Sequence, residues 1–329
     1  MLKELVYRAA CTGLGGAVVG QLGRLIEVPE LPLRASPARH PLQLVLTIDT
    51  EGGYVAPDER RVWQGREPHA FQGYIDGVRN ILDVLARRGV KATFLVSPHG
   101  FSATGATRLA VDRTLARVLA EGHEIGLHLH PTSDRALAAA LGRTFDAPAS
   151  CSIGEADRLL LLTTGKRLLE ENAGAAVTSF RWGNWALDRA GARTVAEAGF
   201  RVDSSAVPRL RDHARGRFDW SASGERAPWW IAPRLLEVPI ATYRLGPAWL
   251  RADPLYGPLL DRAFDLYRAR APRESAPFPF VVMTHSTEAT HRDGSPTRVL
   301  SDLDRFLERA LAEDDVRAAR LLDITWTDP

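Results

Sequence analysis

Two acidic residues follow a strongly apolar run near position 45. Residues 44–48 (LVLTI) are apolar and β-branched, which predicts a buried strand, and Asp49, Glu51 and a glycine pair follow, as at a strand's exit into a loop. In α/β folds, side chains at the carboxyl ends of strands face the crevice where ligands bind. These residue types therefore indicate a site, with capping of the following turn by Asp49 as the alternative.

His128 and His130 form the second cluster and lie directly before a proline. Residues i and i+2 of a strand share a face, so we expect both imidazoles to project together. With a carboxylate from Asp49 or Glu51 they make the His₂–carboxylate set of a catalytic Zn²⁺ that keeps an open position for water. A pair of pocket histidines without a metal is the alternative. His123 falls on the opposite face and is expected to pack near the preceding glycine turn.

Two further predicted strands end in polar side chains. Arg181 follows the apolar residues of 177–180, and His285 follows 280–284. Four polar strand ends in one chain are expected to converge on a single pocket, with residues 203–205 (Asp-Ser-Ser) as a fifth contributor.

The elements that must position these residues alternate between strand and helix. Glycine stops and apolar periodicity predict strands at 90–96, 124–129, 177–180, 201–203, 236–240, 280–283 and 321–326, and helices at 74–88, 114–120, 159–173, 190–198 and 299–312. This pattern predicts an α/β chain with a parallel sheet, closed in the manner of a barrel. The Pro- and Trp-rich span 209–233 is too long for a plain connection and is expected to be a functional loop.

Composition limits the partners. The chain has 329 residues, 45% hydrophobic and 25% charged, with 42 Lys and Arg against 40 Asp and Glu. No basic block is long enough to follow a phosphate backbone, so nucleic acid is not an expected partner. Cys11 and Cys151 are too far apart in sequence for a disulfide framework or a zinc knuckle.

The first 41 residues differ from the rest. Their glycine-rich centre lacks a strong apolar core, and four prolines, at 29, 32, 37 and 41, follow it. We expect an N-terminal arm and linker at 1–41, with possible contact to a membrane surface, and a single main domain at 42–329. Because no convincing signal peptide is visible, a cytoplasmic location is expected.

These motifs resemble the NodB-type polysaccharide deacetylases, carbohydrate esterase family 4, from about residue 42 to the C-terminus. Residues 47–52 (TIDTEG) resemble the family's first motif, 91–96 (KATFLV) its second strand and 122–128 (GHEIGLH) the run into its metal motif. Phe180 and Arg181 resemble the R-x-P motif, and residues 284–286 (THS) the final motif. Residues 199–205 and 236–239 (LEVP) are similar to segments of members that act on surface glycans.

The resemblance implies an irregular (β/α) barrel that removes N-acetyl groups from an aminosugar glycan or its precursor. It implies Asp49 as catalytic base, Arg181 as the residue that orients it, and His285 as catalytic acid. It implies one divalent metal ion, Zn²⁺ or a similar ion such as Co²⁺, held by Glu51, His128 and a further ligand.

The sequence departs from the family pattern at three positions. The acids are separated by a threonine, so the metal carboxylate is Glu51. The second family histidine would fall at Thr132; His130 is the nearest substitute, and Asp134 is an alternative. Gly183 replaces the proline of R-x-P.

Aromatic residues suit a sugar substrate, because flat rings stack on pyranose faces. The residues expected to contact substrate are Trp182, Asn184, Trp229 and Trp230. Three alternatives remain open: a glycosidase using Asp49 and Glu237, a hydrolase of a small amide, and a non-catalytic glycan-binding protein.

Overall fold

The computed structural model of the chain describes residues 25–28, 40–63, 66–210, 220, 226–273 and 276–326. Most of the expected N-terminal arm and linker, and most of the span 211–225, lie outside the described residues. No helix within the described ranges is long and apolar enough to cross a membrane.

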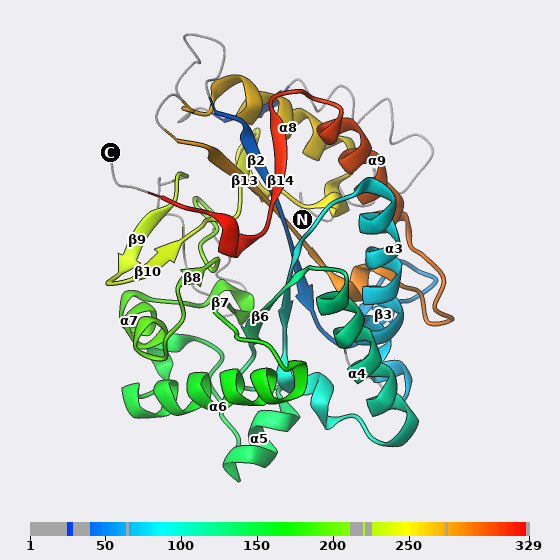
Figure 1. Cartoon of the computed structure of the whole chain (residues 1–329), viewed down its shortest axis with the longest axis vertical. Coiled ribbons are helices and arrows are strands. Elements are labelled where there is room, and N and C mark those ends of the chain that lie inside the picture. The colour runs from blue at the N-terminus through cyan, green and yellow to red at the C-terminus, as the bar shows by residue number, and fades with distance from the viewer. Residues whose placement is uncertain are drawn as a thin grey trace.

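A curled, mainly parallel sheet forms the centre of the molecule (Figure 1). Its strands follow the order β13-β2-β5-β6-β7-β8-β10-β9, and β14 also pairs with β2. The bounds are β2 Leu42–Thr50, β5 Thr93–Val96, β6 Glu124–Leu129, β7 Ser179–Trp182, β8 Val202–Asp203, β9 Trp229–Ala232, β10 Leu235–Glu237, β13 Phe278–His285 and β14 Val316–Ala319. Only β9 runs antiparallel to its neighbour, so the predicted α/β barrel is confirmed in an incomplete form.

Backbone hydrogen bonds connect the chain after β10 with β13, the strand at the other end of the sheet order. Ala241 N donates to Val281 O (3.0 Å) and Met283 N donates to Ala252 O (3.0 Å), so the chain that follows β10 returns to β13. This chain carries the hairpin of β11 (Thr242–Leu245) and β12 (Ala248–Arg251), to which β1 (Ile26–Glu27) adds a strand.

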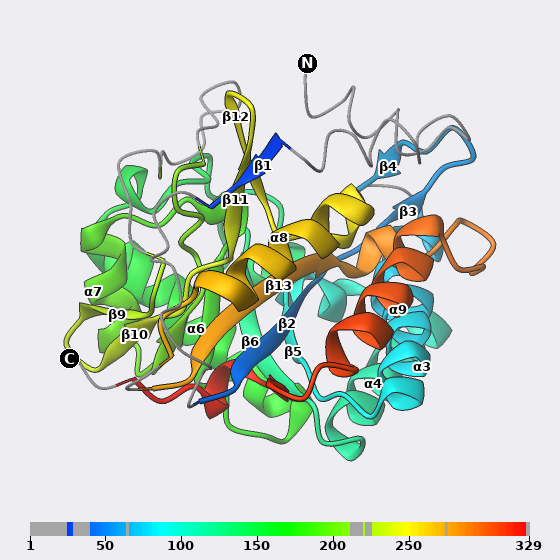
Figure 2. The same cartoon turned by 90° about the horizontal axis from the view of Figure 1, so that it is seen from above.

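Helices cover the outer face of the sheet, with α3, α4 and α9 on one side and α6 and α7 on the other (Figure 2). Their bounds are α3 Val78–Arg88, preceded by a π-helical turn at Gly73–Gly77, α4 Gly105–Ala120, α5 Arg135–Leu141, α6 Glu155–Ala173, α7 Arg189–Glu197, α8 Pro258–Arg270 and α9 Arg298–Leu311. Each predicted helix overlaps an observed one. Helix α3 has the expected form, with Arg87 and Arg88 in its last turn and left-handed Gly89 ending it.

Some elements differ from the sequence-based expectation. The last strand is β14 at Val316–Ala319, and the expected strand 321–326 begins instead as a 3₁₀ turn at Leu321–Asp323. Helices α5 and α8 were not anticipated. In α5 the run of alanines leaves little hydrophobic periodicity to read, and its only buried residue is Leu137.

The core lies between the sheet and its helices and is built from β-branched and aromatic residues. Within β2, eight of the nine residues are buried, including Asp49 and Thr50 at its end. Because β2 stays buried up to its last residues, Asp49 is enclosed at the carboxyl end of the strand and Glu51 follows directly. The site therefore lies at this edge of the sheet.

Candidate active site

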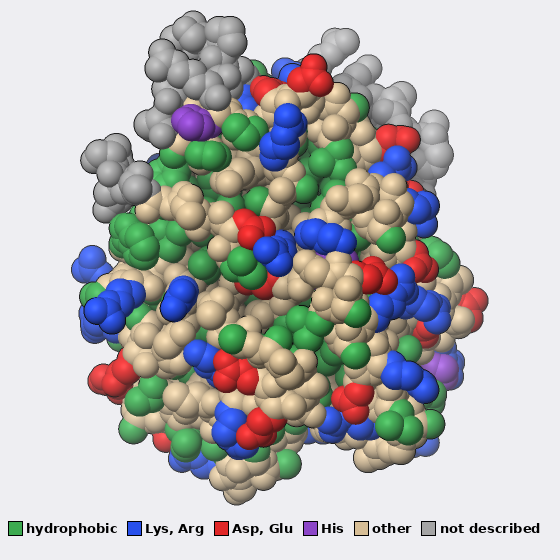
Figure 3. All heavy atoms as spheres, viewed as in Figure 1, with side chains coloured by type: hydrophobic (Ala, Val, Ile, Leu, Met, Phe, Trp, Pro, Cys, Tyr) green, Lys and Arg blue, Asp and Glu red, His purple; other side chains and the backbone are tan. Residues whose placement is uncertain are grey.

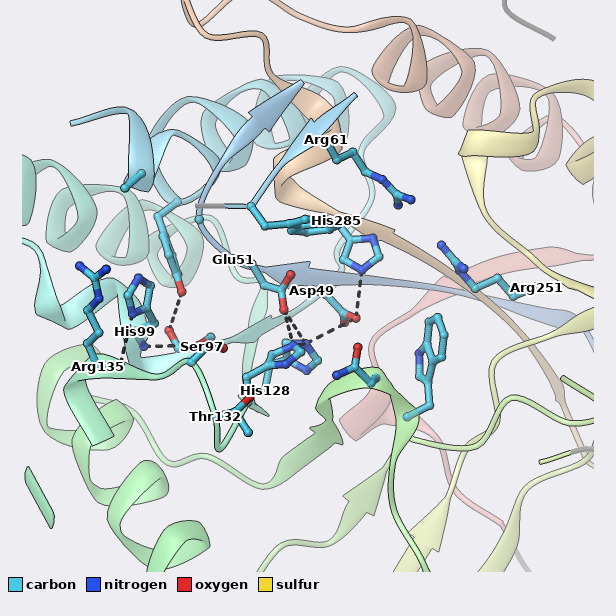
Figure 4. Close-up of a pocket in the computed structure, with 18 residues that line it drawn as sticks. Asp49, Glu51, Arg61, Ser97, His99, His128, Thr132, Arg135, Arg251 and His285 are labelled. Atoms are coloured by element: carbon cyan, nitrogen blue, oxygen red, sulfur yellow. Dashed lines mark hydrogen bonds and ion pairs between the residues drawn. The ribbon is translucent and has the colours of Figure 1, made fainter. Parts of the chain in front are cut away.

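A cavity of about 410 Å³ lies at the carboxyl ends of the central strands (Figure 4). Its walls include Asp49 and Glu51 from β2 and the loop after it, His128 and His130 from the end of β6, and His285 from the end of β13. Parallel strands bring their carboxyl ends to one edge, and the register pairs Asp49 with His285 directly. Three of the four predicted polar strand ends therefore line one cavity; Arg181 and residues 203–205 do not line it, although Arg181 bonds Asp49.

Glu51, His128 and His130 form a group that could hold a metal ion. His128 Nε2 lies 3.0 Å from Glu51 Oε1 and 3.0 Å from His130 Nε2, and His130 Nε2 lies 2.5 Å from Glu51 Oε1. The ligand atoms of the three residues all lie within 4.8 Å of one another. The i, i+2 spacing of the two histidines thus produces a shared face, as strand geometry requires.

The position of the hydrogen on the His128 ring is compatible with metal binding through Nε2. Its Nδ1 lies 3.1 Å from the carbonyl oxygen of Arg181, which can only accept, so Nδ1 carries the hydrogen. In the neutral ring Nε2 is then a bare acceptor, yet it faces a carboxylate oxygen. Two acceptors at 3.0 Å repel each other unless a proton or a cation lies between them. A donor set of two imidazoles and one carboxylate fits Zn²⁺, and histidine ligands commonly donate their other nitrogen to a backbone carbonyl.

Gly183 makes room for His130. A Cβ at position 183 would lie 2.5 Å from His130 Cε1 and Nδ1, too close for any side chain. Two departures from the family pattern are therefore linked. Gly183 stands where the motif has proline, and only a glycine there leaves room for His130 to act as the second histidine of the group.

Asp49 is held as a carboxylate by Arg181. Arg181 Nη1 donates to Asp49 Oδ1 (2.5 Å), while its Nη2 donates to Thr47 Oγ1 and to Ser204 Oγ (2.9 Å each) and its Nε donates to Ser204 O (2.7 Å). Burial alone would raise the pKa of Asp49, but Arg181, and then His128 and His285, lower it below its usual value. Asp49 Oδ2 stays turned toward His128 Nε2 (3.8 Å) and His285 Nε2 (3.9 Å).

The curvature of the sheet makes this ion pair possible. Arg181 belongs to β7, three strands from β2, and adjacent strands are spaced about 4.8 Å apart, so a flat sheet would separate the two side chains by about 14 Å. In the curled sheet both point inward and meet, with Arg181 fully buried.

His285 is linked through Glu288 to Arg61. His285 Nδ1 lies 3.3 Å from Glu288 Oε2, and Arg61 Nη1 donates to Glu288 Oε1 (2.6 Å). Burial would lower the pKa of His285, but the charge of Glu288 and its hydrogen bond to the ring, followed by Asp49, raise it above its usual value. A ring that keeps its proton and directs Nε2 into the cavity can act as a general acid.

The predicted alternatives for the third ligand lie elsewhere. Asp134 caps α5, and its carboxylate accepts hydrogen bonds from Leu137 N (3.0 Å), His99 N (2.9 Å) and Ser97 Oγ (3.1 Å). Burial raises the pKa of Asp134 to about 6, and its carboxylate oxygens are already used by these three donors. Thr132 lines the cavity but does not belong to the ligand group.

Three of the four predicted substrate contacts are not supported by their positions. Trp182 is fully buried, and its Nε1 donates to Pro148 O (2.8 Å), so it belongs to the core. Trp229 and Trp230 lie on β9 and do not line this cavity; Trp230 instead lines a separate hollow beside α7. Asn184 does line the cavity, at the turn that leaves β7.

Two other sequence-based expectations can be examined. Glu237, which the glycosidase alternative requires beside Asp49, is fully buried and does not line the cavity, so that alternative is not supported. His123 is buried at the other end of β6 and accepts a hydrogen bond from Ala92 N (3.1 Å), so it packs near the glycine turn as predicted.

Several cavity residues had no signal in the sequence. Arg61 and Trp63 come from the segment of the β3–β4 hairpin (Tyr54–Val55, Arg61–Val62), and Arg251 ends β12. The Trp63 ring contacts His285 edge to face with centroids 5.2 Å apart. None of these residues lies in a periodic or repeated pattern, so only the fold brings them to the site.

Charges on the rest of the surface are mixed. On the coloured part of the face in Figure 3, blue and red side chains are interspersed, so that part carries no extended patch of one sign. This distribution agrees with the absence of a long basic block in the sequence.

Solved structures share this fold. A protein assigned as a polysaccharide deacetylase from Mycobacterium smegmatis is 19% identical, with a TM-score of 0.55 over 92% of this chain and 99% of that one. A protein assigned as a polysaccharide deacetylase from Pseudomonas aeruginosa PAO1 is 21% identical, with a TM-score of 0.55 over 87% and 89%. Puue allantoinase is 19% identical, with a TM-score of 0.55 over 89% and 91%.

No known family profile matches the sequence, and no curated protein is similar to it in sequence. At these identities the likeness is one of fold: the chain has the NodB-type (β/α) barrel of the polysaccharide deacetylases.

Proposed function

We propose that this protein is a metal-dependent hydrolase that removes N-acetyl groups from an aminosugar glycan or its precursor. One observation carries the proposal: a group of Glu51, His128 and His130 that could hold a metal lies in one cavity with Asp49, whose pKa is lowered, and His285, whose pKa is raised. Amide hydrolysis needs these three functions within reach of one bond.

Glu51 Oε1, His128 Nε2 and His130 Nε2 would hold the ion, which we expect to be Zn²⁺. The chemistry that such an ion supplies when bound is polarisation of the amide carbonyl and a lowered pKa of water. Burial would raise the pKa of Glu51, but His130 and His128 lower it well below its usual value, so the ligand is available as a carboxylate.

Asp49 acts as the general base in this proposal. Its Oδ1 is occupied by Arg181 and its Oδ2 faces the cavity, so Oδ2 accepts the proton of the attacking water. Arg181 keeps Asp49 ionised and fixes its orientation through bonds to Thr47 and Ser204.

His285 acts as the general acid in this proposal, and Asp49 Oδ2 lies near both its ring and the ring of His128. His285 Nε2 faces the cavity while Nδ1 is directed at Glu288, so the proton on Nε2 is the one transferred to the departing amine. Glu288 is bound in turn by Arg61, which fixes the ring position.

The cavity suits a sugar ring. Trp63 and Trp185 both line it and supply aromatic surface against which a sugar can pack, and the Asn184 amide can donate to a hydroxyl or carbonyl. These residues replace Trp182, Trp229 and Trp230 as the proposed substrate contacts.

A second candidate function is hydrolysis of a small amide. It is supported by the equal similarity of Puue allantoinase to this chain, with the same TM-score as the deacetylases. The same base and acid would serve, and only the substrate would differ.

Acetate release tests the proposal directly. The zinc-loaded protein is incubated with N-acetylglucosamine oligomers and, separately, with allantoin and other small amides. Acetate from the oligomers that disappears with a chelator and returns with zinc is the expected result. Turnover of the small amides alone would favour the second candidate, and no turnover of either would leave a glycan-binding protein as the better account.

A further inference from the structure

Two arginines line one wall of the cavity and neither transfers a proton in the proposed hydrolysis, although Arg61 supports the acid behind His285. Arg61 comes from β4 and Arg251 from the end of β12, and their guanidinium groups point toward the same space beside His285 (Figure 4). They reach this space from separate segments of the chain.

The acids that neutralise these arginines lie behind them. Arg61 Nη1 bonds Glu288 Oε1 (2.6 Å), and Arg251 Nη2 bonds Asp253 Oδ2 (2.5 Å). The Glu288 and Asp253 side chains are only 1% and 0% exposed, and neither lines the cavity. A molecule in the cavity therefore meets two guanidinium groups while their carboxylates stay buried.

Each arginine also lies over the ring of a tryptophan that lines the cavity. Arg61 lies 5.4 Å from the ring centroid of Trp63, and Arg251 lies 5.0 Å from that of Trp185. A guanidinium in such a contact keeps N–H groups for ligands.

Arg251 carries unused hydrogen-bonding capacity. The residue is only 8% exposed, and its buried Nε has no hydrogen-bond partner in the part of the chain that is described. Because Nε is itself enclosed, an anion in the cavity would meet the terminal nitrogens of the Arg251 guanidinium instead.

We propose that Arg61 and Arg251 form a subsite for an anionic oxygen group, a carboxylate or a phosphate, on the glycan bound in the cavity. The proposal rests on the deacetylase function and names its substrate class: an acidic glycan. Paired guanidinium groups suit such groups because they offer several N–H donors to two or three oxygens. His285 would protonate the departing amine, so the acidic group belongs to the sugar part of the substrate.

The competing explanation is that both arginines serve only to neutralise Glu288 and Asp253. In that case the cavity would not distinguish acidic from neutral sugars. Arg135 offers a matched control, because it lines the same cavity and is exposed. Figure 4 shows it on the opposite wall, beside His99.

The experiment compares kcat/KM of the zinc-loaded protein for three N-acetylglucosamine oligomers: neutral, carrying a glucuronate residue, and carrying a 6-phosphate. The wild type is expected to prefer one acidic oligomer by about tenfold or more, and the preferred oligomer identifies the anion. R61Q should abolish most of this preference, whereas R135Q should keep it. Equal preference in wild type and R61Q, or no preference in wild type, would overturn the proposal.

Binding measurements separate this proposal from the deacetylase function. Titration calorimetry of the same three oligomers detects the subsite even if no acetate is released from any of them. Because R251Q would leave Asp253 buried without its partner, the double variant R251Q/D253N is used for the second arginine. Tighter binding of an acidic oligomer by wild type than by both R61Q and R251Q/D253N is expected; equal affinities would contradict the subsite whatever the turnover.

Discussion

Buried carboxyl groups occur at strand ends in two parts of the same sheet, and their pKa values are shifted in opposite directions. Asp49, near the end of β2, bonds Arg181 at 2.5 Å, and its pKa is lowered. Asp203 and Glu237, the last residues of β8 and β10, are register partners, are both fully buried and have raised pKa values.

Asp203 and Glu237 each have another acid as neighbour, whereas Asp49 has the positively charged Arg181. Ser205 Oγ donates to Asp203 Oδ1 (2.7 Å) and Ala206 N donates to Glu237 Oε1 (2.9 Å), but no donor among the described residues bonds Asp203 Oδ2 or Glu237 Oε2. Burial raises both pKa values, and the charge of Asp203 raises that of Glu237 further. We predict that the two groups share one proton, which would satisfy the remaining oxygens.

The comparison shows that burial alone does not determine the charge of an acid in this fold. The position of the acid relative to Arg181 determines its charge. The Arg181 guanidinium bonds Asp49 directly, whereas its Nε and one of its Nη2 hydrogen bonds go to Ser204. An ionised acid that faces the cavity suits a general base, whereas the protonated pair suits a structural element.

Removing the ionised acid should have the largest effect. D49N keeps the shape of the side chain but cannot accept a proton, so we expect kcat/KM to fall by about 10²–10⁴-fold. Acetate release measures the loss, and circular dichroism and metal content serve as controls that should not change. Activity within tenfold of wild type would remove Asp49 from the role of base.

Altering the partner of Asp49 should have a smaller effect. R181K keeps the charge but loses the fork that also binds Thr47 and Ser204, so kcat/KM should fall by about 10–100-fold. R273K is the matched control, since Arg273 is equally buried, pairs with Asp315 and lies near the start of β2, far along the strand from Asp49. Both variants should lose stability, and only R181K should lose activity; an equal loss of activity in both would make Arg181 merely structural.

Breaking the protonated pair should change stability and not chemistry. The raised pKa of Glu237 means that the folded chain keeps a proton that the unfolded chain releases above about pH 4.3, so this group destabilises the fold as pH rises above that value. The amide of E237Q does not titrate. As pH rises, the free energy of unfolding of E237Q should therefore increase relative to that of wild type, by at most about 1.4 kcal/mol per pH unit.

Denaturant unfolding at pH 5 to 8 measures this difference. D203N should have a similar effect, and the double variant should gain little more, because the pair holds one shared proton. A parallel pH dependence in wild type and E237Q would mean that the two carboxyls do not share a proton.

Much of the site could be predicted from local spacing. The i, i+2 histidines and the acids after an apolar strand follow from period-two alternation, which acts over a few residues. The same alternation explains the error at Trp182: once Arg181 points into the sheet's interior, its neighbour must point to the other face, toward the carbonyl of Pro148.

The remaining site residues depend on contacts that local sequence does not encode. Arg61 and Arg251 are brought together by a hairpin and by chain that returns after β10. The acid that pairs with Arg61, Glu288, is far from it in sequence, whereas Asp253 lies two residues from Arg251. The reach of Arg181 to Asp49 likewise depends on the curvature of the whole sheet.

The most direct test of the account is the metal content of the purified protein by elemental analysis after incubation with zinc and removal of excess ion. We predict about one ion per chain for wild type and for H123N, a buried histidine of the same segment outside the group, and none for H128A. G183A should retain less, because its methyl group would displace His130. An ion-free wild type, or an H128A variant that keeps its ion, would contradict the assignment of Glu51, His128 and His130 as the metal site.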